Sequence, residues 1–351
     1  MRIFCYFVEP ASYTLDLASN IYDKNNIDYC FIKTTSLVQS DEKSDKVFLD
    51  KKLLFGKIKF VRKARKDHDL IIVNGYNNYP FIMTFFLNLF SFNKKYIATE
   101  SDTQLIVPSN IIKRFIKWIY LSIIFKNKYV LGFAGGNYSH KDLFRNYGMD
   151  ESRIFLMPLM INNEKFYCER KEKITPFTFL FVGRLVAHKN VEALIEKFNA
   201  HFADKNAVLR IVGGGEQEVY LKNKYESKQV IFVGKKFESD LIKEFHKASC
   251  FVCPSLFEPW GLVVNEALSS GLPVIASKEV GACFDLILGK KTGFITDDIK
   301  DFGEKMMTFF NDEQLLYLYS KNASKFMQEK WNYKLYDKCL NKAIEKVNAW
   351  H

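Results

Sequence analysis

Short apolar runs alternate with longer stretches of helical periodicity along the whole chain. In the first half, the runs that read as strands are RIFCYFV, DYCFI, DLIIVNG, KKYIATE and YVLGFAG. In the second half they are FTFLFVG, AVLRIVG, QVIFVG, ASCFVCPS, PVIAS and TGFI. Near-continuous apolar strands, each followed by a helical stretch, are typical of parallel sheets covered on both faces. The pattern therefore predicts an α/β protein with two Rossmann-like, doubly wound domains.

The alternation is interrupted once, near MPLMINNEKFYCERKEKITPF, where a strand-like run ends and a charged stretch follows. Thr175-Pro176 then restarts the pattern. We expect an N-terminal domain at 1–168, a C-terminal domain at 169–335 and a last helix at 336–351. No strand follows that helix, so it either caps the structure or crosses back to the N-terminal domain. A chain of 351 residues has the length of two ordinary domains.

The positive charge is concentrated in one segment. The chain has a formal net charge of +11. Between Lys51 and Lys128 there are fifteen Lys or Arg against four Asp or Glu, so this segment alone carries +11. Such a surplus indicates an anionic partner, which is a nucleic acid, an anionic lipid or a phosphorylated substrate. No recognition helix or RNA-binding signature organises these cations, so a nucleic acid is not the partner we expect.

The longest apolar stretches are YPFIMTFFLNLFSF and FIKWIYLSIIF, and neither reaches the length of a membrane span. The second lies within IIKRFIKWIYLSIIFKNK, where five cations flank aromatic side chains. A basic helix of this kind can lie in the interface of an anionic bilayer. The alternative is a core helix with a solvated basic face. Both interpretations stay open.

Seven cysteines are scattered along the chain, and the N-terminus MRIFCYFVEP reads as a first strand without a secretion signal. Cys250 and Cys253 form a C-x-x-C, but they lie in a predicted buried strand, and no second cysteine pair completes a zinc site. We expect reduced thiols in a cytoplasmic protein, with attachment to the inner face of the membrane as the alternative.

Two cations follow the first strand of the second half. In FVGRLVAHKNVEALIEKF the strand ends at Gly183, and Arg184 and Lys189 precede a helix that begins near Asn190. Arginine offers a forked donor and lysine a point charge, so the pair suits a diphosphate beside a helix N-terminus. Two solvated cations in a loop are the simpler interpretation of this motif when it is taken alone.

Two further turns are rich in glycine. RIVGGGEQEVYLKNKY places Gly213 and Gly214 at a strand end, where the backbone can approach a ligand closely. The glycines do not match the spaced dinucleotide fingerprint. QVIFVGKK repeats the pattern at Gly234 and Lys235, again at the carboxyl end of a predicted strand.

Two carboxylates flank one short predicted helix in FEPWGLVVNEALSSG. Glu258 precedes the helix and Glu266 lies on its second turn. The N–H groups around Gly261, Leu262 and Val263 would point at an anion. Carboxylates accept hydrogen bonds from sugar hydroxyls while amides bind phosphate, so the combination indicates a nucleotide sugar.

In this order the motifs resemble those of a known family. VGRL…HKNVE, IVGGG, FVG, PSLFEPWGLVVNEALSSGLPVIAS and EVGACFDLILGKKTGFI resemble the retaining GT-B glycosyltransferases with an E-x7-E signature, a group 1, family 4-like type. The likeness covers nearly the whole second half, whereas the first half matches only the general pattern. The resemblance implies two domains that face each other across a cleft, the first binding acceptor and the second binding donor.

The resemblance also implies roles for individual residues. Arg184 and Lys189 would bind the donor diphosphate, Glu258 the hydroxyls of the donor sugar, and Glu266 the ribose. Backbone groups from Gly234 to Lys236 would contact the base, and Gly281 lies in a loop that faces the donor. The full set expected to bind the donor is Gly183, Gly213, Gly214, Gly234, Lys235, Trp260, Gly261, Leu262, Val263, Glu266 and Gly281.

The first half departs from the family pattern in two places. Family members often carry a glycine-rich loop after the first strand, where this chain has VEPASYTLDL. They also often carry a histidine at the cleft end of a middle strand, where this chain has IATESDTQ. Asp102, or else Glu100, is the candidate for the acceptor-side role. Both departures concern the acceptor more than the donor.

Asp67-His68-Asp69 spells D-x-D, the metal motif of a different glycosyltransferase architecture. It precedes a predicted strand, at the end opposite to ligands, and we interpret it as a polar strand entry. No histidine shows ligand spacing, so we expect neither a metal nor a cofactor.

The sequence thus predicts a retaining, metal-independent glycosyltransferase that moves a sugar from a nucleotide diphosphate sugar to a glycan or lipid-linked acceptor in cell-surface polysaccharide or glycolipid synthesis. A GT-B-like epimerase or phosphorylase is the alternative among enzymes. A nucleic-acid-binding protein that uses the basic first half is the alternative from another class.

Overall fold

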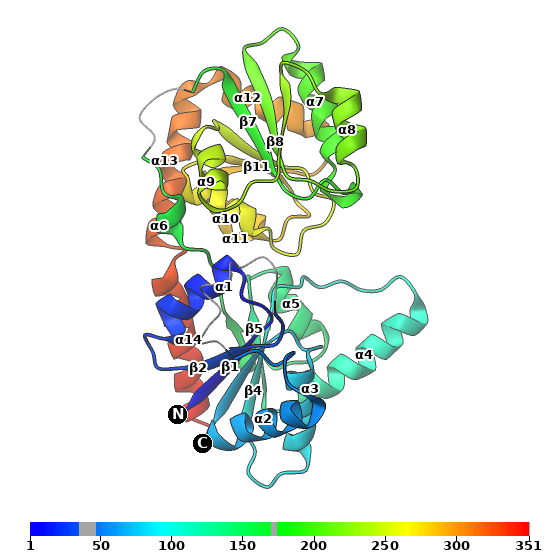
Figure 1. Cartoon of the computed structure of the whole chain (residues 1–351), viewed down its shortest axis with the longest axis vertical. Helices are drawn as coiled ribbons and strands as arrows, with labels where there is room; N and C mark the ends of the chain where they lie inside the picture. Colours follow the sequence, from blue (N-terminus) through cyan, green and yellow to red (C-terminus); the bar gives the residue numbers. More distant parts are fainter. Residues whose placement is uncertain (35–46, 170–173, 351) are drawn as a thin grey trace. The chain divides into compact units, whose positions relative to one another are not determined.

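The computed structural model describes residues 1–34, 47–169 and 174–350, which form two compact units (Figure 1). Unit 1 comprises Met1–Met160 and Tyr333–His351, and unit 2 comprises Ile161–Asn332. The sequence analysis drew its boundaries at 168 and 335, so it groups residues 161–168 and 333–335 differently. The charged stretch at 170–173, beside the first of those boundaries, lies outside the described residues.

Unit 1 contains a parallel six-stranded sheet in the order β2-β1-β3-β4-β5-β6. Its strands are β1 Ile3–Phe7, β2 Asp28–Phe31, β3 Leu70–Asn74, β4 Tyr96–Ser101, β5 Val130–Ala134 and β6 Ile154–Leu156. Every residue of β1, β4 and β5 is buried, which explains their continuous apolar sequence because both faces of the sheet are covered.

The helices of unit 1 form two layers. They are α1 Ser12–Leu17, which continues as the π-helix η1 Ala18–Tyr22, then α2 Leu54–Asp67, α3 Tyr79–Leu89, α4 Ile111–Lys126, α5 Ser139–Asn146, the 3-10 turn η3 Glu151–Arg153 and α14 Tyr333–Asn348. Right-handed crossovers put α2 to α5 on one face of this sheet, where they share one apolar core with the strands. α14 contacts η1 and β6 on the opposite face, as Figure 1 shows.

Unit 2 repeats the design with a second parallel six-stranded sheet, in the order β12-β11-β10-β7-β8-β9. Its strands are β7 Phe177–Val182, β8 Ala207–Val212, β9 Val230–Gly234, β10 Cys250–Cys253, β11 Val274–Ser277 and β12 Gly293–Thr296. The order reverses direction between β7 and β10. In open α/β sheets, loops at such a switch point diverge and leave room for a ligand at the carboxyl ends of the strands.

The helices of unit 2 also cover both faces. They are α6 Asn163–Phe166, the 3-10 turn η4 Ala187–Lys189, α7 Val191–Phe202, α8 Glu218–Tyr225, α9 Glu238–His246, α10 Leu262–Ser269, α11 Ala282–Leu286, α12 Lys300–Asn311 and α13 Glu313–Glu329. α7 packs against α12, and α10 packs against α6 and α13. The resulting core is rich in phenylalanine, with Phe179, Phe198 and Phe202 in mutual edge and stacked contacts.

The start and the end of unit 2 are joined by one side chain. The amide nitrogen Nδ2 of Asn163 donates to the main-chain carbonyls of Met327, at 2.7 Å, and Trp331, at 2.8 Å. Its Oδ1 accepts from the hydroxyl of Ser269 at 3.0 Å. The indole of Trp331 stacks on that of Trp260, with ring centres 5.6 Å apart and planes inclined by 16°. The chain therefore enters and leaves unit 2 at neighbouring points.

Each of the eleven sequence segments predicted as strands overlaps a strand of the structure. The sequence analysis did not include β6, a strand of three residues that lies at the edge of its sheet. Within the described residues, none of the helices has both the length and the apolar character needed to span a bilayer.

Candidate functional site

Three neighbouring strands of unit 2, β7, β8 and β9, lead into glycine turns at one edge of the sheet. β7 leads into Gly183, β8 into Gly213 and Gly214, and β9 ends at Gly234. Main-chain hydrogen bonds join these turns, because Gly183 N donates to Val212 O and Gly213 N donates to Gly234 O, both at 3.0 Å. The glycines predicted from separate motifs therefore form one continuous main-chain surface.

Gly213 cannot be replaced without moving the backbone. Its φ is +145°, and a Cβ atom at this position would lie 1.8 Å from the carbonyl oxygen of Gly183. Only glycine permits this approach of two main chains. The turn after β8 therefore lies directly against the start of the loop that carries Arg184.

Lys189 and Glu258 form an ion pair in this site, 69 positions apart in sequence. Lys189 ends the turn η4, and Glu258 precedes α10. Only 13% of the lysine side chain and 16% of the glutamate side chain are exposed. Burial lowers the pKa of Lys189, and the neighbouring charge of Arg184 lowers it further, whereas Cys253 acts in the opposite direction. A cation pair next to one carboxylate can hold an anion together with a hydroxyl-bearing group.

Arg184 is exposed, and no carboxylate of the described residues forms an ion pair with it. Its positive charge is close enough to influence Lys189. Because Glu258 pairs with Lys189 and not with Arg184, a surplus of positive charge remains at this edge of the sheet. An anion with two charged groups, such as a diphosphate, would complete that balance.

The N-terminus of α10 closes the site on its other side. Gly261 caps the helix with φ +94°, in the left-handed region. The amides of Leu262 and Val263 lie in the first turn, where N–H groups have no acceptor within the helix. The main chain of Glu258 pairs with that of Gly281, because Gly281 N donates to Glu258 O at 3.1 Å. The loops after β10 and β11 therefore hold one another beside Glu258.

Glu266 is a carboxyl group without a counter-ion. It lies on the second turn of α10, and the described residues offer its side chain neither a hydrogen-bond donor nor a cation. Part of its surface remains open to solvent, yet the protein around it raises its pKa to about 8. A polar group kept in this state is satisfied by a ligand that brings its own hydroxyls.

Lys235 and Trp260, which are also predicted to bind the donor, differ in where their side chains lie. The chain of Lys235 lies close over Gly214, since a Cβ at Gly214 would lie 2.8 Å from the lysine Cε. Trp260 is only 3% exposed. Its Nε1 donates to Asn265 Oδ1 at 2.8 Å, and its ring stacks on Trp331. The side chain of Trp260 therefore serves packing, and only its main chain faces the loop that contains Gly281.

The two acidic candidates of unit 1 lie at the carboxyl end of β4. Asp102 is exposed, and its carbonyl contacts His140 Nε2 at 2.9 Å. Glu100 is 7% exposed, and burial raises its pKa to about 7. It accepts a hydrogen bond from Asn74 Nδ2 and another, at 3.5 Å, from the hydroxyl of Tyr336. Asp102 and Glu100 belong to unit 1, and the residues described above belong to unit 2.

Sequence reasoning missed two parts of this arrangement. It assigned Lys189 and Glu258 to different groups of the ligand and did not predict that they pair with each other. It also missed the buried chain of hydroxyls in which Tyr22 contacts Tyr336 at 2.9 Å and Tyr336 donates to Glu100. Tyr336 is 236 positions from Glu100, so no local motif signals that contact.

The D-x-D segment is engaged in structural contacts. Asp69 accepts from the main-chain nitrogen of Arg2 at 2.9 Å and pairs with Lys95 at 3.0 Å. His68 contacts Asp28 Oδ2 at 2.9 Å. Across the part of the chain that the structure describes, no three His, Cys, Asp or Glu side chains cluster in a way that could hold a metal ion.

Known proteins resemble this chain over the region that contains the site. Residues 164–326 match the family described as glycosyl transferases group 1. A probable sucrose-phosphate synthase of Thermosipho melanesiensis is 25% identical over 60% of this chain and 52% of its own length. The capsular polysaccharide biosynthesis glycosyltransferase CapM of Staphylococcus aureus is 28% identical over 67% of this chain and 60% of its own. The chain thus spans little more than half of these relatives.

A solved structure resembles the chain over nearly its full length. HepE of Anabaena, crystallised in complex with UDP, has a TM-score of 0.71 and 14% identity, and the match covers 98% of this chain and 100% of HepE. Together with the two parallel six-stranded sheets, this likeness confirms the predicted fold class, an α/β fold with the two Rossmann-like domains of GT-B glycosyltransferases.

Proposed function

Because residues 164–326 match the group 1 glycosyl transferases, we propose that this protein is a retaining glycosyltransferase. It takes a sugar from a nucleotide diphosphate sugar and transfers it to a glycan or lipid-linked acceptor, in the synthesis of cell-surface polysaccharide or glycolipid. The observation that carries the proposal is the Lys189–Glu258 pair, which lies beside the unpaired Arg184 and the first turn of α10.

In this proposal the donor divides between the two kinds of group in the site. The diphosphate binds Arg184, Lys189 and the amides at the start of α10, since helix N-termini and cations favour anions. Glu258 accepts hydrogen bonds from the sugar hydroxyls. When the donor binds, Glu258 bonds to the sugar and Lys189 bonds to the diphosphate. Each charged group of the ion pair therefore keeps a partner, and no buried charge is left unpaired.

The nucleoside would lie toward β8 and β9. Glu266 contacts the ribose, and the peptide groups of Gly213, Gly214 and Gly234 approach the base and its phosphates closely. Lys235 covers the same turn. The structural neighbour HepE was crystallised in complex with UDP, which supports a nucleoside diphosphate as the ligand class.

Catalysis would be mainly electrostatic. Negative charge grows on the diphosphate as the glycosidic bond breaks, and Lys189 and Arg184 stabilise that charge without a metal ion. A leaving phosphate oxygen on the same face deprotonates the acceptor, which keeps the anomeric configuration. Asp102, or its buried neighbour Glu100, orients the acceptor from unit 1.

Thermal-shift measurements with nucleoside diphosphates and their sugars test the donor. A true donor present at 100 times its Kd stabilises the folded protein by about 2.7 kcal/mol. The Arg184→Ala/Lys189→Ala variant provides the control, because it should lose that stabilisation. Incubation with the donor and an acceptor should then give a product whose anomeric configuration, measured by NMR, equals that of the donor. Failure of every nucleotide sugar to stabilise the protein, or donor consumption without a glycosylated product, would contradict the proposal.

A further inference from the structure

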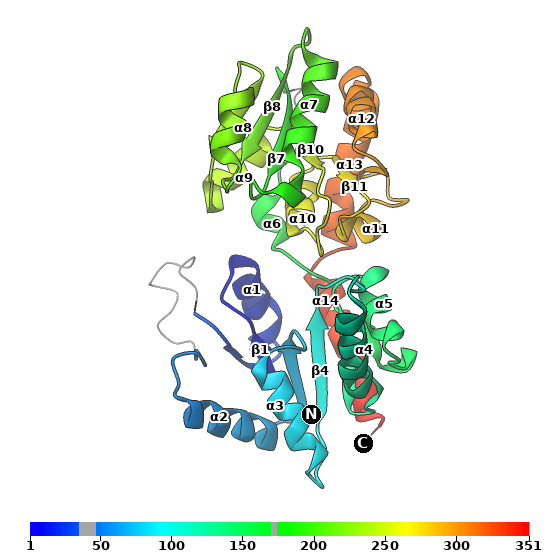
Figure 2. The same cartoon turned by 90° about the vertical axis from the view of Figure 1, so that its right-hand side faces the viewer.

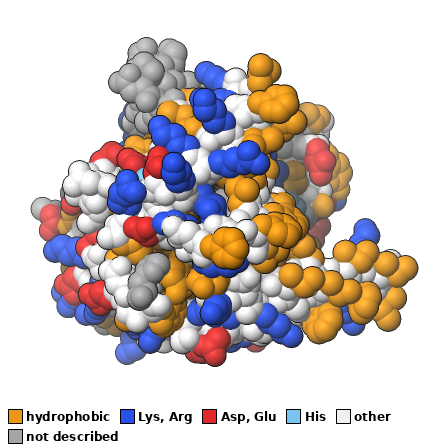
Figure 3. Space-filling view, turned by 90° about the horizontal axis from the view of Figure 1, so that it is seen from below, with side chains coloured by type: hydrophobic (Ala, Val, Ile, Leu, Met, Phe, Trp, Pro, Cys, Tyr) orange, Lys and Arg blue, Asp and Glu red, His pale blue; other side chains and the backbone are white. Residues whose placement is uncertain are grey.

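The outer surface of unit 1 has an unusual combination of apolar and basic side chains. We define the α2–α4 face as the solvent-exposed sides of α2, α3 and α4. These helices cover the same face of the sheet. Only one of their residues, Asp67 at the end of α2, is acidic. Exposed apolar side chains and Lys or Arg side chains lie next to one another on the side of the molecule that Figure 3 shows.

The first half of α4 is exposed on every side. All residues from 109 to 116 are exposed, and the buried residues of the helix come only later, at Leu121, Ser122, Ile124 and Phe125. Ile111 is 76% exposed and Phe115 is 61% exposed. The second half of α4 is therefore a core helix, whereas the first half projects away from the core, as Figures 1 and 2 show.

The projecting half is amphipathic, and its apolar side points away from the protein. At about 100° per residue, its apolar side chains fall within one arc of about 160°. They are Ile111, Ile112, Phe115, Ile116, Trp118, Ile119 and Ile123. Lys113, Arg114 and Lys117 fill the opposite arc, which is the side that Leu121 and Ile124 turn toward the core. A helix selected only for packing on the core would turn its apolar side chains toward the core and its cations toward solvent.

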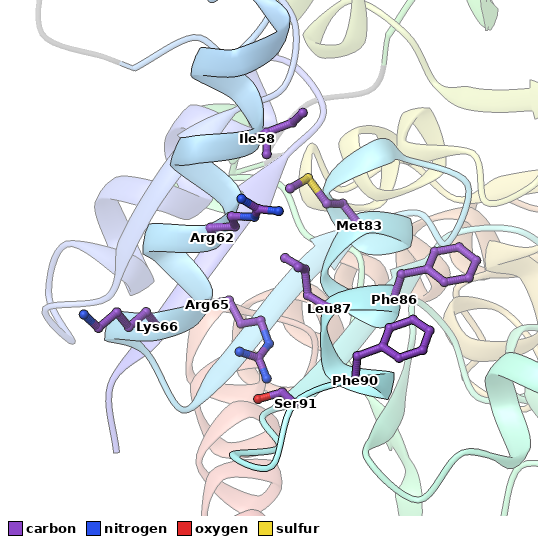
Figure 4. Close-up of a pocket in the computed structure, with 9 residues that line it drawn as sticks. All are labelled: Ile58, Arg62, Arg65, Lys66, Met83, Phe86, Leu87, Phe90 and Ser91. Carbon is purple, nitrogen blue, oxygen red and sulfur yellow. The ribbon is translucent and has the colours of Figure 1, made fainter.

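The other two helices of the α2–α4 face, α2 and α3, also combine cations with exposed apolar side chains. A groove of about 770 Å³ lies between α2 and α3 (Figure 4). Arg62 points from α2 toward Met83 on α3, and Arg65 points toward Ser91. Arg65 is held by Asn88 Oδ1 and Asn93 O, but Arg62 is exposed and has no carboxylate partner among the described residues. Phe90, at the rim, is 86% exposed.

We propose that the α2–α4 face docks on the surface of an anionic lipid bilayer. The apolar arc of α4 enters the interface among the acyl chains, while Lys113, Arg114 and Arg62 meet the lipid phosphates. Charge complementarity selects this occupant, since a second copy of the chain would bring the same unpaired cations against one another. A bilayer offers apolar depth and negative charge together. The proposal does not depend on which sugar is transferred, or on whether one is.

Vesicle sedimentation tests the proposal on the full chain. Wild-type protein should sediment with vesicles of phosphatidylcholine and phosphatidylglycerol, and about ten-fold less with phosphatidylcholine alone. Phe115→Ser/Ile116→Ser and Lys113→Glu/Arg114→Glu should each lower sedimentation about ten-fold. The matched controls lie on α13 of unit 2. Tyr317→Ser/Leu318→Ser removes side chains of similar exposure, 61% and 45%, and Lys321→Glu/Lys325→Glu makes the same charge change. Both should bind vesicles as the wild type does.

Three results would overturn the proposal. They are absence of binding to the anionic vesicles, equal binding by the α4 variants and the wild type, and equal loss in the α13 controls. If Phe115→Ser/Ile116→Ser instead converts a dimer to a monomer in sedimentation velocity, the occupant is a second copy of the chain. Cooperative thermal unfolding of the same variants shows that they are folded, and thermal shifts with nucleotides, measured separately, distinguish a failure of this proposal from a failure at the donor site.

Discussion

The two units share a parallel sheet with crossover helices, but they assemble their polar groups over different distances along the chain. In unit 2, the glycine turns and charged side chains of the site all lie between Gly183 and Gly281. In unit 1, Glu100 is buried beneath Tyr336, which the C-terminal helix α14 brings from the far end of the sequence. After its first strand, unit 2 turns through Gly183, whereas unit 1 continues with Val8 and Glu9. Local motifs therefore identify the chemistry of unit 2 and leave that of unit 1 unidentified.

The largest effect is expected at the ion pair of unit 2. Glu258→Ala and Lys189→Ala should each lower kcat/KM for sugar transfer by about 10²–10³-fold, because each removes a group that acts where charge develops or where the sugar is held. Steady-state kinetics with the donor identified by thermal shift measures this loss. Asp102→Ala is the matched change in unit 1, and it should raise the KM of the acceptor more than that of the donor. Normal turnover by the Glu258→Ala variant would contradict the role of Glu258 in binding the donor sugar.

A second prediction concerns the backbone of the unit 2 site. Gly213→Ala should lower the free energy of unfolding by about 3 kcal/mol or more, because the new Cβ would overlap the carbonyl of Gly183. Gly289→Ala is the control, since it also has a positive φ, +71°, but no atom within 4 Å of the new Cβ. It should lower that free energy by only about 1 kcal/mol. Urea unfolding measures both, and equal values would mean that close approach is not what requires glycine at position 213.

The smallest effect is expected from two carboxyl groups whose pKa burial raises, Glu266 in unit 2 and Glu100 in unit 1. Burial raises the pKa of Glu266 to about 8, so the folded protein retains a proton that the unfolded chain loses near pH 4.5. The wild type should therefore lose stability relative to Glu266→Gln as the pH rises from 5 to 8. Glu100→Gln should show the same sign over a range that ends near pH 7. Urea midpoints at several pH values measure these differences, and parallel curves for Glu266→Gln and the wild type would contradict the unpaired state of Glu266.

The fold could be predicted from the sequence because its strands and turns have local sequence patterns, and the donor-site residues, which come from the same kind of pattern, stay a prediction. Buried parallel strands are continuous apolar runs, and glycines mark the turns at the ends of β7, β8 and β9. β6 was not predicted, because a strand of three residues is too short to show a periodic pattern of apolar positions. The ion pair between Lys189 and Glu258 was not predicted, because both residues had been assigned to a ligand. They come into contact only in the folded chain.

The outward apolar face of α4 could be predicted only in part. The sequence showed a basic helix with aromatic residues, and this pattern is the same whether its apolar side faces a core or solvent. What distinguishes the two is the direction of the core, which is fixed by the buried side chains of Leu121 and Phe125. Those contacts depend on the sheet beneath α4 and not on the helix itself.

Asn163 has a consequence for how such a chain can be rebuilt. Asn163 donates to the carbonyls of Met327 and Trp331, and so it holds the first and last residues of the segment 161–332 close together. That segment is thus a cassette with both ends at the same place. It can be excised, or exchanged for the equivalent segment of a relative, by two cuts that leave every strand of both sheets uncut.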